Sequence, residues 1–317
     1  MQLVIGMVKV KTTGKYFKRV LSLVLILSVI LSLAVPFTVH AAEQEPATGN
    51  DIYALAYKIN PNNQSVWSNI EIVFQKGDTR DPSKEYLKTF SNFADDQFDN
   101  KPPWTTLKPT GSGNSFGSNA KRFVIKDKIQ PMSISGWFRD TWALEEIQGL
   151  ENLDTSECTD MSGAFSSLSF MKKLDLSSFD TSKVVKFDGM INSNAIESVN
   201  VSGFKFDSCQ SLVSFIRGNK LTEINLSGID VSKCTTIKAF VTNCAALEEL
   251  DCTSFNPRNV ELLQNAFCSN ASLKSIKFGE FQPGIDNDQT YIKFNKMFLD
   301  CPSLEEIDFA TFDLPKT

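Results

Sequence analysis

The stretch LTEINLSGI (221–229) decides the fold, because its pattern recurs along the chain from Leu144 to Phe312. In this nine-residue pattern the first, fourth and sixth residues are apolar, and the ninth is usually Phe. Two further clear copies are MKKLDLSSF (171–179) and LEEIDFATF (304–312), and weaker copies lie between them. This recurrence indicates a repeat protein.

Two columns of apolar residues keep the same spacing. The centre of the pattern recurs at steps of 27, 25, 25, 26, 26 and 31 residues, at Ile147, Leu174, Val199, Ile224, Leu250, Ile276 and Ile307. A second column lies nine residues ahead of it (ten in one unit), at Phe138, Phe165, Met190, Phe215, Phe240, Phe267 and Phe298. Columns in register predict stacked units that bury their apolar faces against one another.

Each unit is expected to contain one short strand, since the alternation Leu174-Asp175-Leu176 points two side chains inward and one outward. The second column lies in segments such as residues 160–165, where small and polar residues surround one large side chain. This composition favours a helical or 3₁₀ turn on the convex side. The sequence therefore predicts an α/β repeat of about seven units.

The repeats resemble those of bacterial surface proteins with 26-residue repeats, which are relatives of the BspA-like leucine-rich repeat proteins. The resemblance rests on runs such as GLENLDTS (149–156) and LDLSSFDTSKV (174–184), and it covers the chain from residue 135 to its end. It implies a leucine-rich-repeat-like solenoid. It also implies an exported bacterial surface protein that binds other macromolecules in the manner of an adhesin.

Residues 1–41 read as a signal peptide, because five basic residues precede an apolar run from Val20 to Val35. A membrane anchor is the alternative, but the run is short for a bilayer. We expect cleavage after Ala41, a secreted or cell-surface location, and no membrane insertion after cleavage. Residues 42–50 are polar and are expected to form a flexible leader.

A small β-rich cap is predicted for residues 51–134, because a solenoid needs its open ends covered. Residues 52–59 and 70–74 read as a hairpin, and residues 123–125 as a third strand. A separate ligand-binding module is the alternative reading of this segment. We expect Trp104 and Tyr57 to lie in its core.

The solenoid is expected over residues 135–317, truncated or uncapped at its C-terminus, because the last residues match the middle of a repeat. The final LPKT (314–317) matches the LPxT pattern of a sorting signal. It lacks the following Gly, apolar tail and basic residues, and it falls where the repeat would continue. We therefore interpret it as part of the repeat.

Charge and composition exclude several functions. Without the signal peptide the chain keeps 27 of its 32 basic residues against 37 acidic ones, so it carries about −10 and should not attract nucleic acid. The only histidine, His40, leaves with the signal peptide, which removes Ser-His and Cys-His nucleophile pairs and His-ligated zinc. The acidic loop 286–288 resembles a calcium loop only loosely. We expect no enzymatic activity, no catalytic residues, no metal and no cofactor.

The seven cysteines each occupy an apolar column of the repeat, so we expect buried free thiols. A bridge between Cys209 and Cys234 is the sharper alternative, because neighbouring units bring equivalent positions to within about 5 Å.

The candidate binding site is the outward row of the predicted strands, since solenoids use such extended faces for partners. The row is polar and mostly acidic or amide, and we assign to it Asp175, Asn200, Glu223, Asn225, Glu249, Asp251, Lys277 and Asp308. A merely solvated face is the alternative. Paired carboxylates such as Glu248-Glu249 recur at fixed repeat positions, and we interpret these pairs as part of a solvated face.

The function predicted from the sequence is that of an exported, adhesin-like binding protein that recognises an extracellular protein or a surface glycan through the solenoid face. The alternative is a non-catalytic accessory or spacer region of a larger secreted protein, such as a hydrolase.

Overall fold

The computed structural model divides the chain into two compact units, residues 1–45 and residues 46–317. The described residues are 3–5, 8–10, 46–48, 51–62, 69–94, 102–110, 112–284 and 292–313. In the first unit, β1 (Leu3–Ile5) and β2 (Val8–Val10) pair antiparallel, and the predicted apolar run of the signal peptide lies outside the described residues. No helix within the described ranges is both long and apolar enough to cross a membrane.

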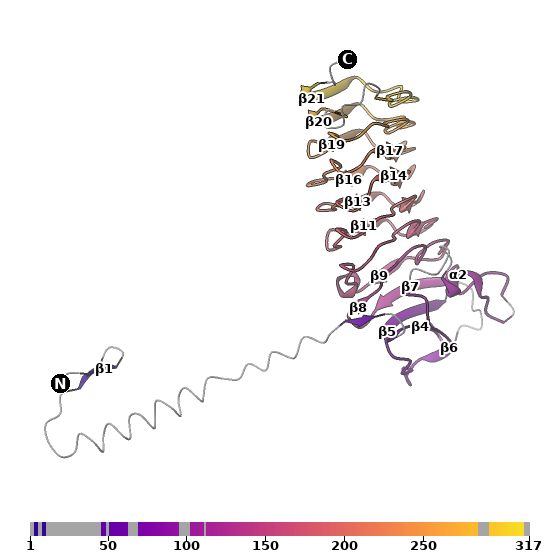
Figure 1. Cartoon of the computed structure of the whole chain (residues 1–317). Coiled ribbons are helices and arrows are strands. Elements are labelled where there is room, and N and C mark those ends of the chain that lie inside the picture. The colour runs from indigo at the N-terminus through magenta and orange to yellow at the C-terminus, as the bar shows by residue number, and fades with distance from the viewer. Residues whose placement is uncertain are drawn as a thin grey trace. The chain divides into compact units, whose positions relative to one another are not determined.

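The second unit begins with a five-stranded sheet in the order β6-β4-β5-β7-β9 (Figure 1). Its strands are β4 (Ile52–Lys58), β5 (Ile70–Lys76), β6 (Glu85–Phe90), β7 (Ala120–Ile125) and β9 (Glu146–Gln148). The antiparallel pairing of β4 with β5 confirms the predicted hairpin, and β7 confirms the third strand. Strand β9 belongs to the first repeat and pairs with β7, so one sheet spans the cap and the repeat region. A separate parallel pair joins β3 (Ala47–Thr48) to β8 (Ile129–Gln130).

Aromatic side chains connect this sheet to the first repeat. Trp104, on the short helix α2 (Pro103–Thr106), donates from its indole N–H to the carbonyl oxygen of Trp137 at 2.8 Å. Phe74 stacks on Trp137 with ring centroids 4.8 Å apart. Trp104 and Tyr57 are buried, which confirms that both belong to the core.

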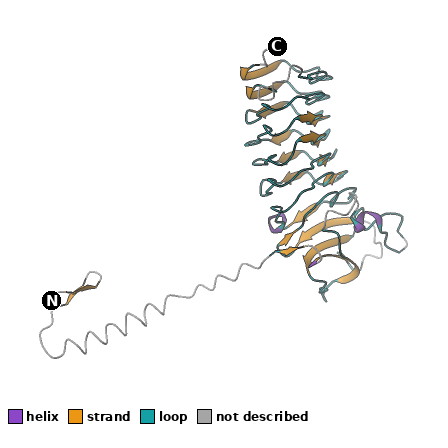
Figure 2. Ribbon diagram, viewed as in Figure 1, coloured by secondary structure: helices purple, strands orange, loops and turns teal. Residues whose placement is uncertain are grey.

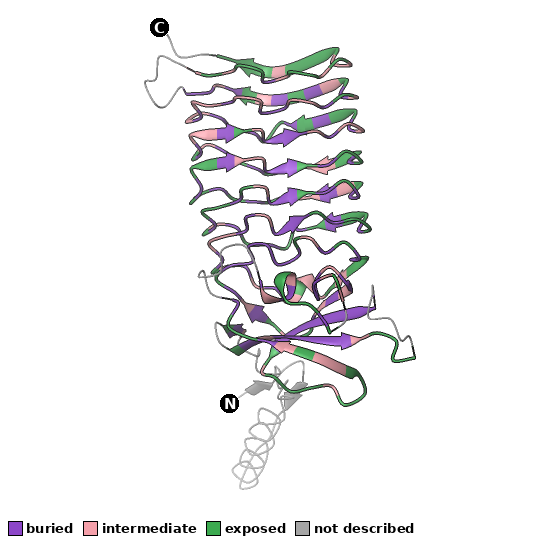
Figure 3. Cartoon of the chain, turned by 90° about the vertical axis from the view of Figure 1, so that its right-hand side faces the viewer, coloured by how far each residue is buried: buried purple, intermediate pink, exposed green. Residues whose placement is uncertain are grey.

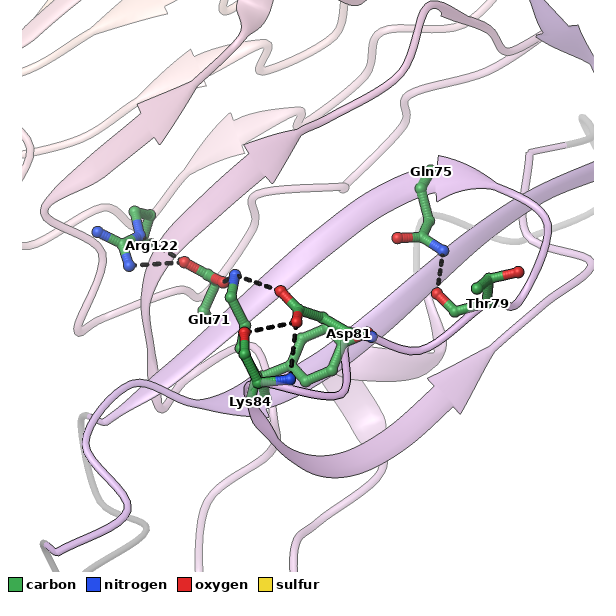
Figure 4. A network of polar contacts seen from close by, with 8 residues as sticks. Glu71, Gln75, Thr79, Asp81, Lys84 and Arg122 are labelled. Atoms are coloured by element: carbon green, nitrogen blue, oxygen red, sulfur yellow. Dashed lines mark hydrogen bonds and ion pairs between the residues drawn. The ribbon is translucent and has the colours of Figure 1, made fainter.

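A buried carboxylate is neutralised on one face of the same sheet (Figure 4). Glu71 on β5 accepts hydrogen bonds from Arg122 Nε at 2.7 Å and forms an ion pair with Arg122 Nη2 at 2.6 Å. Lys84 forms a second ion pair with Glu71 and lies beside Asp81. The carboxylate side chain is only 4% exposed, so two cations offset the cost of burying its charge.

The repeat region stacks short parallel strands whose central residues follow the predicted column. These strands are β11 (Lys173–Asp175), β13 (Ser198–Asn200), β16 (Glu223–Asn225), β19 (Glu249–Cys252), β20 (Ser275–Phe281) and β21 (Glu306–Phe312). Leu174 pairs with Val199 and Val199 with Ile224, while Leu250 pairs with Ile276 and Ile276 with Ile307. The predicted repeat register is therefore confirmed, in a repeat-like, β-rich architecture of the kind expected for a solenoid.

The second column differs in part from its prediction. Turns with a hydrogen bond from residue i to residue i−3 do occur there, as from Ala164 N–H to the carbonyl oxygen of Met161, but in four units a two-residue strand begins at the column residue or directly after it. A second parallel ladder joins β10 (Phe165–Ser166), β12 (Ile191–Asn192), β15 (Ile216–Arg217) and β18 (Val241–Thr242), and a third joins β14 (Ser211–Val213) to β17 (Thr236–Lys238). Among the described residues of the repeat region the one helix is the 3₁₀ helix η2 (Leu150–Asn152), and α2 lies in the cap (Figure 2). The reason is that backbone groups near the second column form hydrogen bonds between successive repeat units, or coils. For example, Phe165 N–H donates to the carbonyl oxygen of Met190.

The side chains of the second column are buried in the core, except that of Phe298, which is half-buried. Figure 3 shows buried residues along the stacked coils and exposed residues at many of their turns. Phe138 stacks on Phe165 with centroids 5.1 Å apart, and Phe215 stacks on Phe240 at 5.4 Å. Large rings at one position of successive coils bury one another, which a single coil could not do.

All seven cysteines are free, as expected from their apolar columns. Five are buried, whereas Cys268 and Cys301 are half-buried. Burial raises the pKa of the Cys158 and Cys244 thiols to about 12, which keeps both in the unreactive thiol form. Cys234 donates from its thiol to the carbonyl oxygen of Cys209 at 3.3 Å, so the two members of the proposed bridge are neighbours without a bond between them.

Replacing Phe215 by Ala should destabilise the repeat region by about 3–5 kcal/mol, because it leaves a cavity in the centre of the column. Phe215→Met should cost less than about 1.5 kcal/mol, since a long apolar side chain refills the space, as Met190 does one unit earlier. The matched control is Phe170→Ala, whose side chain is 59% exposed. Urea unfolding measures all three, and a Phe170→Ala loss as large as that of Phe215→Ala would contradict this packing.

Thiol titration tests the cysteine assignment. After unfolding without reductant, all seven thiols should react, whereas in the native protein the five buried ones should react slowly. A count two lower without reductant than with it would instead show a disulfide.

Candidate functional site: the outward row of the strands

The structure places the predicted site residues on the outward side of the parallel strands. Asp175 pairs with Asn200 and Asn200 with Asn225, so these positions lie in line across β11, β13 and β16. Asp251, Lys277 and Asp308 lie in line across β19, β20 and β21 in the same way. No strand pairing among the described residues joins β16 to β19, so the row consists of two groups.

Much of the row has a structural role, because its side chains close the turn that follows each strand. Asp175 Oδ1 accepts hydrogen bonds from the Ser177 backbone N–H at 3.0 Å and from its hydroxyl at 2.7 Å. The same bond from the backbone N–H two residues later repeats in the other units, with acceptors Asn200, Asn225 and Asp251 and donors Ser202, Ser227 and Thr253. Asp and Asn favour such turns, so the row recurs partly for local reasons.

That these side chains close the turns was not predicted from the sequence, although the spacing of the residues indicates it. Each of the four acceptors is followed, two residues later, by Ser or Thr. Asp-x-Ser spacing recurs at a second turn of the coil, where Asp154, Asp180 and Asp230 accept from Ser156, Ser182 and Ser232.

Hydrogen bonds lower the pKa of the carboxyl groups in these turns. The Ser177 N–H, with its hydroxyl, holds the pKa of Asp175 below its ordinary value, because both groups stabilise the charged form. The Thr253 hydroxyl, with its N–H, does the same for Asp251. Both carboxylates are therefore ionised at neutral pH.

Side chains of neighbouring coils also form hydrogen bonds with one another within the row. Asn200 donates from Nδ2 to Asp175 Oδ1 at 3.0 Å, and the Ser198 hydroxyl donates to Glu223 Oε2 at 3.0 Å. The first group of site residues, on β11, β13 and β16, is therefore largely engaged with itself.

A second exposed row, one residue before each strand, carries opposite charges on neighbouring coils except at Thr222. Lys172 forms an ion pair with Glu197 at 2.7 Å, and Lys274 forms one with Glu248 at 2.7 Å. These pairs are exposed and screened by solvent, so they contribute little to stability. They explain why Glu248, predicted to belong to a solvated face, needs no ligand of its own.

The second group of site residues keeps unpartnered acidic side chains. The side chains of Glu249, Asp308 and the adjacent Glu306 make no hydrogen bond or ion pair with any described residue. Lys277 lies between Asp251 and Asp308 in the register and is exposed. The free negative charge of the face is therefore concentrated on β19 to β21.

The described residues contain no group of three or more His, Cys, Asp or Glu side chains placed to hold a metal ion. The acidic loop at 286–288 lies outside the described residues, as does the LPKT sequence at 314–317.

The turns predict a specific pH dependence. Because the folded-state pKa of Asp175 and Asp251 is lowered, their carboxylates stabilise the fold above the unfolded-state value near pH 4, and this stability is lost as the pH falls through the lowered values. Asp175→Asn keeps the amide oxygen as an acceptor, as in Asn200, so stability at pH 7 should change by less than about 0.5 kcal/mol. Asp175→Leu should cost up to about 1 kcal/mol at pH 7.

Thermal unfolding between pH 7 and pH 3 measures both effects. The Asp175→Asn, Asp251→Asn double variant should lose less stability than the parent on acidification. An equal loss in both proteins would contradict the role of these carboxylates.

Comparison with known proteins is informative at the level of the family alone. No curated protein and no solved structure matches the chain. The family described as "Mycoplasma protein of unknown function, DUF285" matches residues 132–255 and again residues 196–306, which together exceed half of the chain. The two matches overlap, as expected where units repeat, and the family is related to the BspA-like repeats that the sequence resembles. The chain therefore belongs to the DUF285 family.

Proposed function

We propose that this chain is an exported, adhesin-like binding protein, a leucine-rich-repeat-like solenoid of about seven units that recognises a macromolecular partner through its strand face. The observation that carries the proposal is a set of exposed acidic side chains without a hydrogen-bond or ion-pair partner among the described residues, with Glu249 on β19 and with Glu306 and Asp308 on β21, two strands further along the same sheet.

The chemistry of this group suits a basic protein surface. Carboxylates on strands two steps apart, roughly 10 Å, can each face a Lys or Arg side chain on a partner. Complementary charge of this kind accelerates association and selects partners. The extended strands β20 and β21, each seven residues long, lengthen the face at this end.

A capture experiment with residues 42–317 tests the proposal. The face variant changes Glu249, Glu306 and Asp308 to Lys. The matched control changes Asp78, Glu151 and Asp207 to Lys, since these exposed acids lie off the face and give the same change in net charge. Extracellular-matrix and bacterial-surface extracts are passed over the parent protein and both variants, and retained proteins are identified by mass spectrometry.

The expected result is a basic protein retained by the parent and the control but lost from a folded face variant, with retention that weakens as salt is raised. Equal retention by all three proteins would place the site elsewhere. If none retains a protein, the spacer function replaces the binding function.

A further inference from the structure

A second, distinct surface carries polar groups without partners. It is a groove of about 440 Å³ beside the second ladder, lined by Trp142, Asn192, Asn194, Arg217 and Asn219 among others. Asn192 ends β12 and Arg217 ends β15, and the two residues pair in register. Asn194 and Asn219 follow two residues later in the same two coils. Two adjacent coils thus present the same two positions to one groove.

The polar side chains of this groove are free. The amides of Asn192, Asn194 and Asn219 and the guanidinium of Arg217 make no hydrogen bond or ion pair with another described residue. Elsewhere in the repeat such groups are engaged: Asn200 donates to Asp175 and accepts from Ser202, and the buried Asn270 has three backbone partners. The groove is therefore different from the turns that the architecture requires.

These residues are also not imposed by the repeat. In the strand register the preceding coil has Ser166 where the groove has Asn192, and the following coil has Thr242 in the place of Arg217. At the near end of the groove Trp142 is 49% exposed, although a large aromatic side chain is usually buried. Its counterparts Trp104 and Trp137 are completely packed in the core.

We propose that this groove binds an oligosaccharide that carries a carboxylate. An exposed indole offers a flat apolar surface on which a sugar ring can stack, while each amide can both donate to and accept from neighbouring hydroxyl groups. The Arg217 guanidinium matches a carboxylate with two parallel hydrogen bonds. The residues that line this groove include no acidic side chain, so Arg217 has no competing anion within it.

The length of the groove matches more than one sugar. From Trp142 to Asn219 the chain advances through three coils, which at about 4.8 Å a step gives roughly 14 Å. A second groove of about 510 Å³ shares Ser167 and Asn192 with the first and adds the cations Arg139 and Lys186. The same groove is lined by Asp160 and Asp188, and Lys186 lies 3.7 Å from Asp160 and Arg139 3.7 Å from Asp140, so its charges balance and Arg217 remains the cation that the first groove offers to a carboxylate. The net negative charge of the chain does not prevent binding, because salt screens charges beyond about 8 Å.

This site does not depend on the proposed strand-face function, and its test separates the two. Residues 42–317 are titrated with 3′-sialyllactose, tetragalacturonate and lactose, with binding followed by calorimetry and by tryptophan fluorescence. We expect at least one acidic sugar to bind and lactose to bind more weakly by about tenfold or more. The strand-face variant should bind the acidic sugar as the parent does.

Variants at the groove complete the experiment. Trp142→Ala and Arg217→Gln should each weaken binding of the acidic sugar by about tenfold or more. The matched controls, Phe170→Ala and Lys220→Gln, change exposed residues outside the lining and should bind as the parent does. Unchanged melting temperatures show that each variant is folded. Failure of both acidic sugars to bind, equal binding of lactose, or unchanged binding by the groove variants would overturn the proposal.

Discussion

The fold depends on hydrogen bonds between coils that lie one repeat apart in the sequence. Phe165 N–H donates to the carbonyl oxygen of Met190 at 2.8 Å, Ile191 to Phe215 at 3.1 Å, and Ile216 to Phe240 at 2.9 Å. The backbone N–H groups of one coil donate to carbonyl groups of the next coil, so a single coil would leave these hydrogen bonds unmade. A single coil also could not bury its large apolar side chains. Equivalent positions of successive coils therefore lie at the spacing of parallel strands.

This constraint decides what each surface can do. On the strand face, residues of one column meet across coils, and most of the first group engage one another or the following turn, as Asp175 and Asn200 do. The carboxylates of Glu249, Glu306 and Asp308 make no hydrogen bond or ion pair with a described residue. Beside the second ladder, the column changes its residues within two coils, and a groove with free amides, Arg217 and Trp142 results. Departures from the repeat therefore mark candidate function more clearly than the repeat itself.

The sequence predicted the period, the register and the apolar columns, because residues such as Leu174 and Val199 repeat at a fixed step and pair one to one. It did not predict the second ladder, since one Phe among small residues is compatible with a helical turn as well as with a two-residue strand. Strand β6 was missed because most of its side chains are at least partly exposed, so no apolar alternation marks it. The ion pairs between coils depend on side-chain conformations that column alignment does not give.

The central claim is that successive coils are held in register by hydrogen bonds along the second ladder. Amide hydrogen exchange, resolved by NMR on residues 42–317, tests it most directly. The amides of Phe165, Ile191, Ile216, Val241 and Phe267 donate to the next coil and should exchange slowly. Those of the turn residues Asn194 and Asn219, which donate to no described residue, should exchange fast. Fast exchange at the ladder positions in the folded protein would contradict the account.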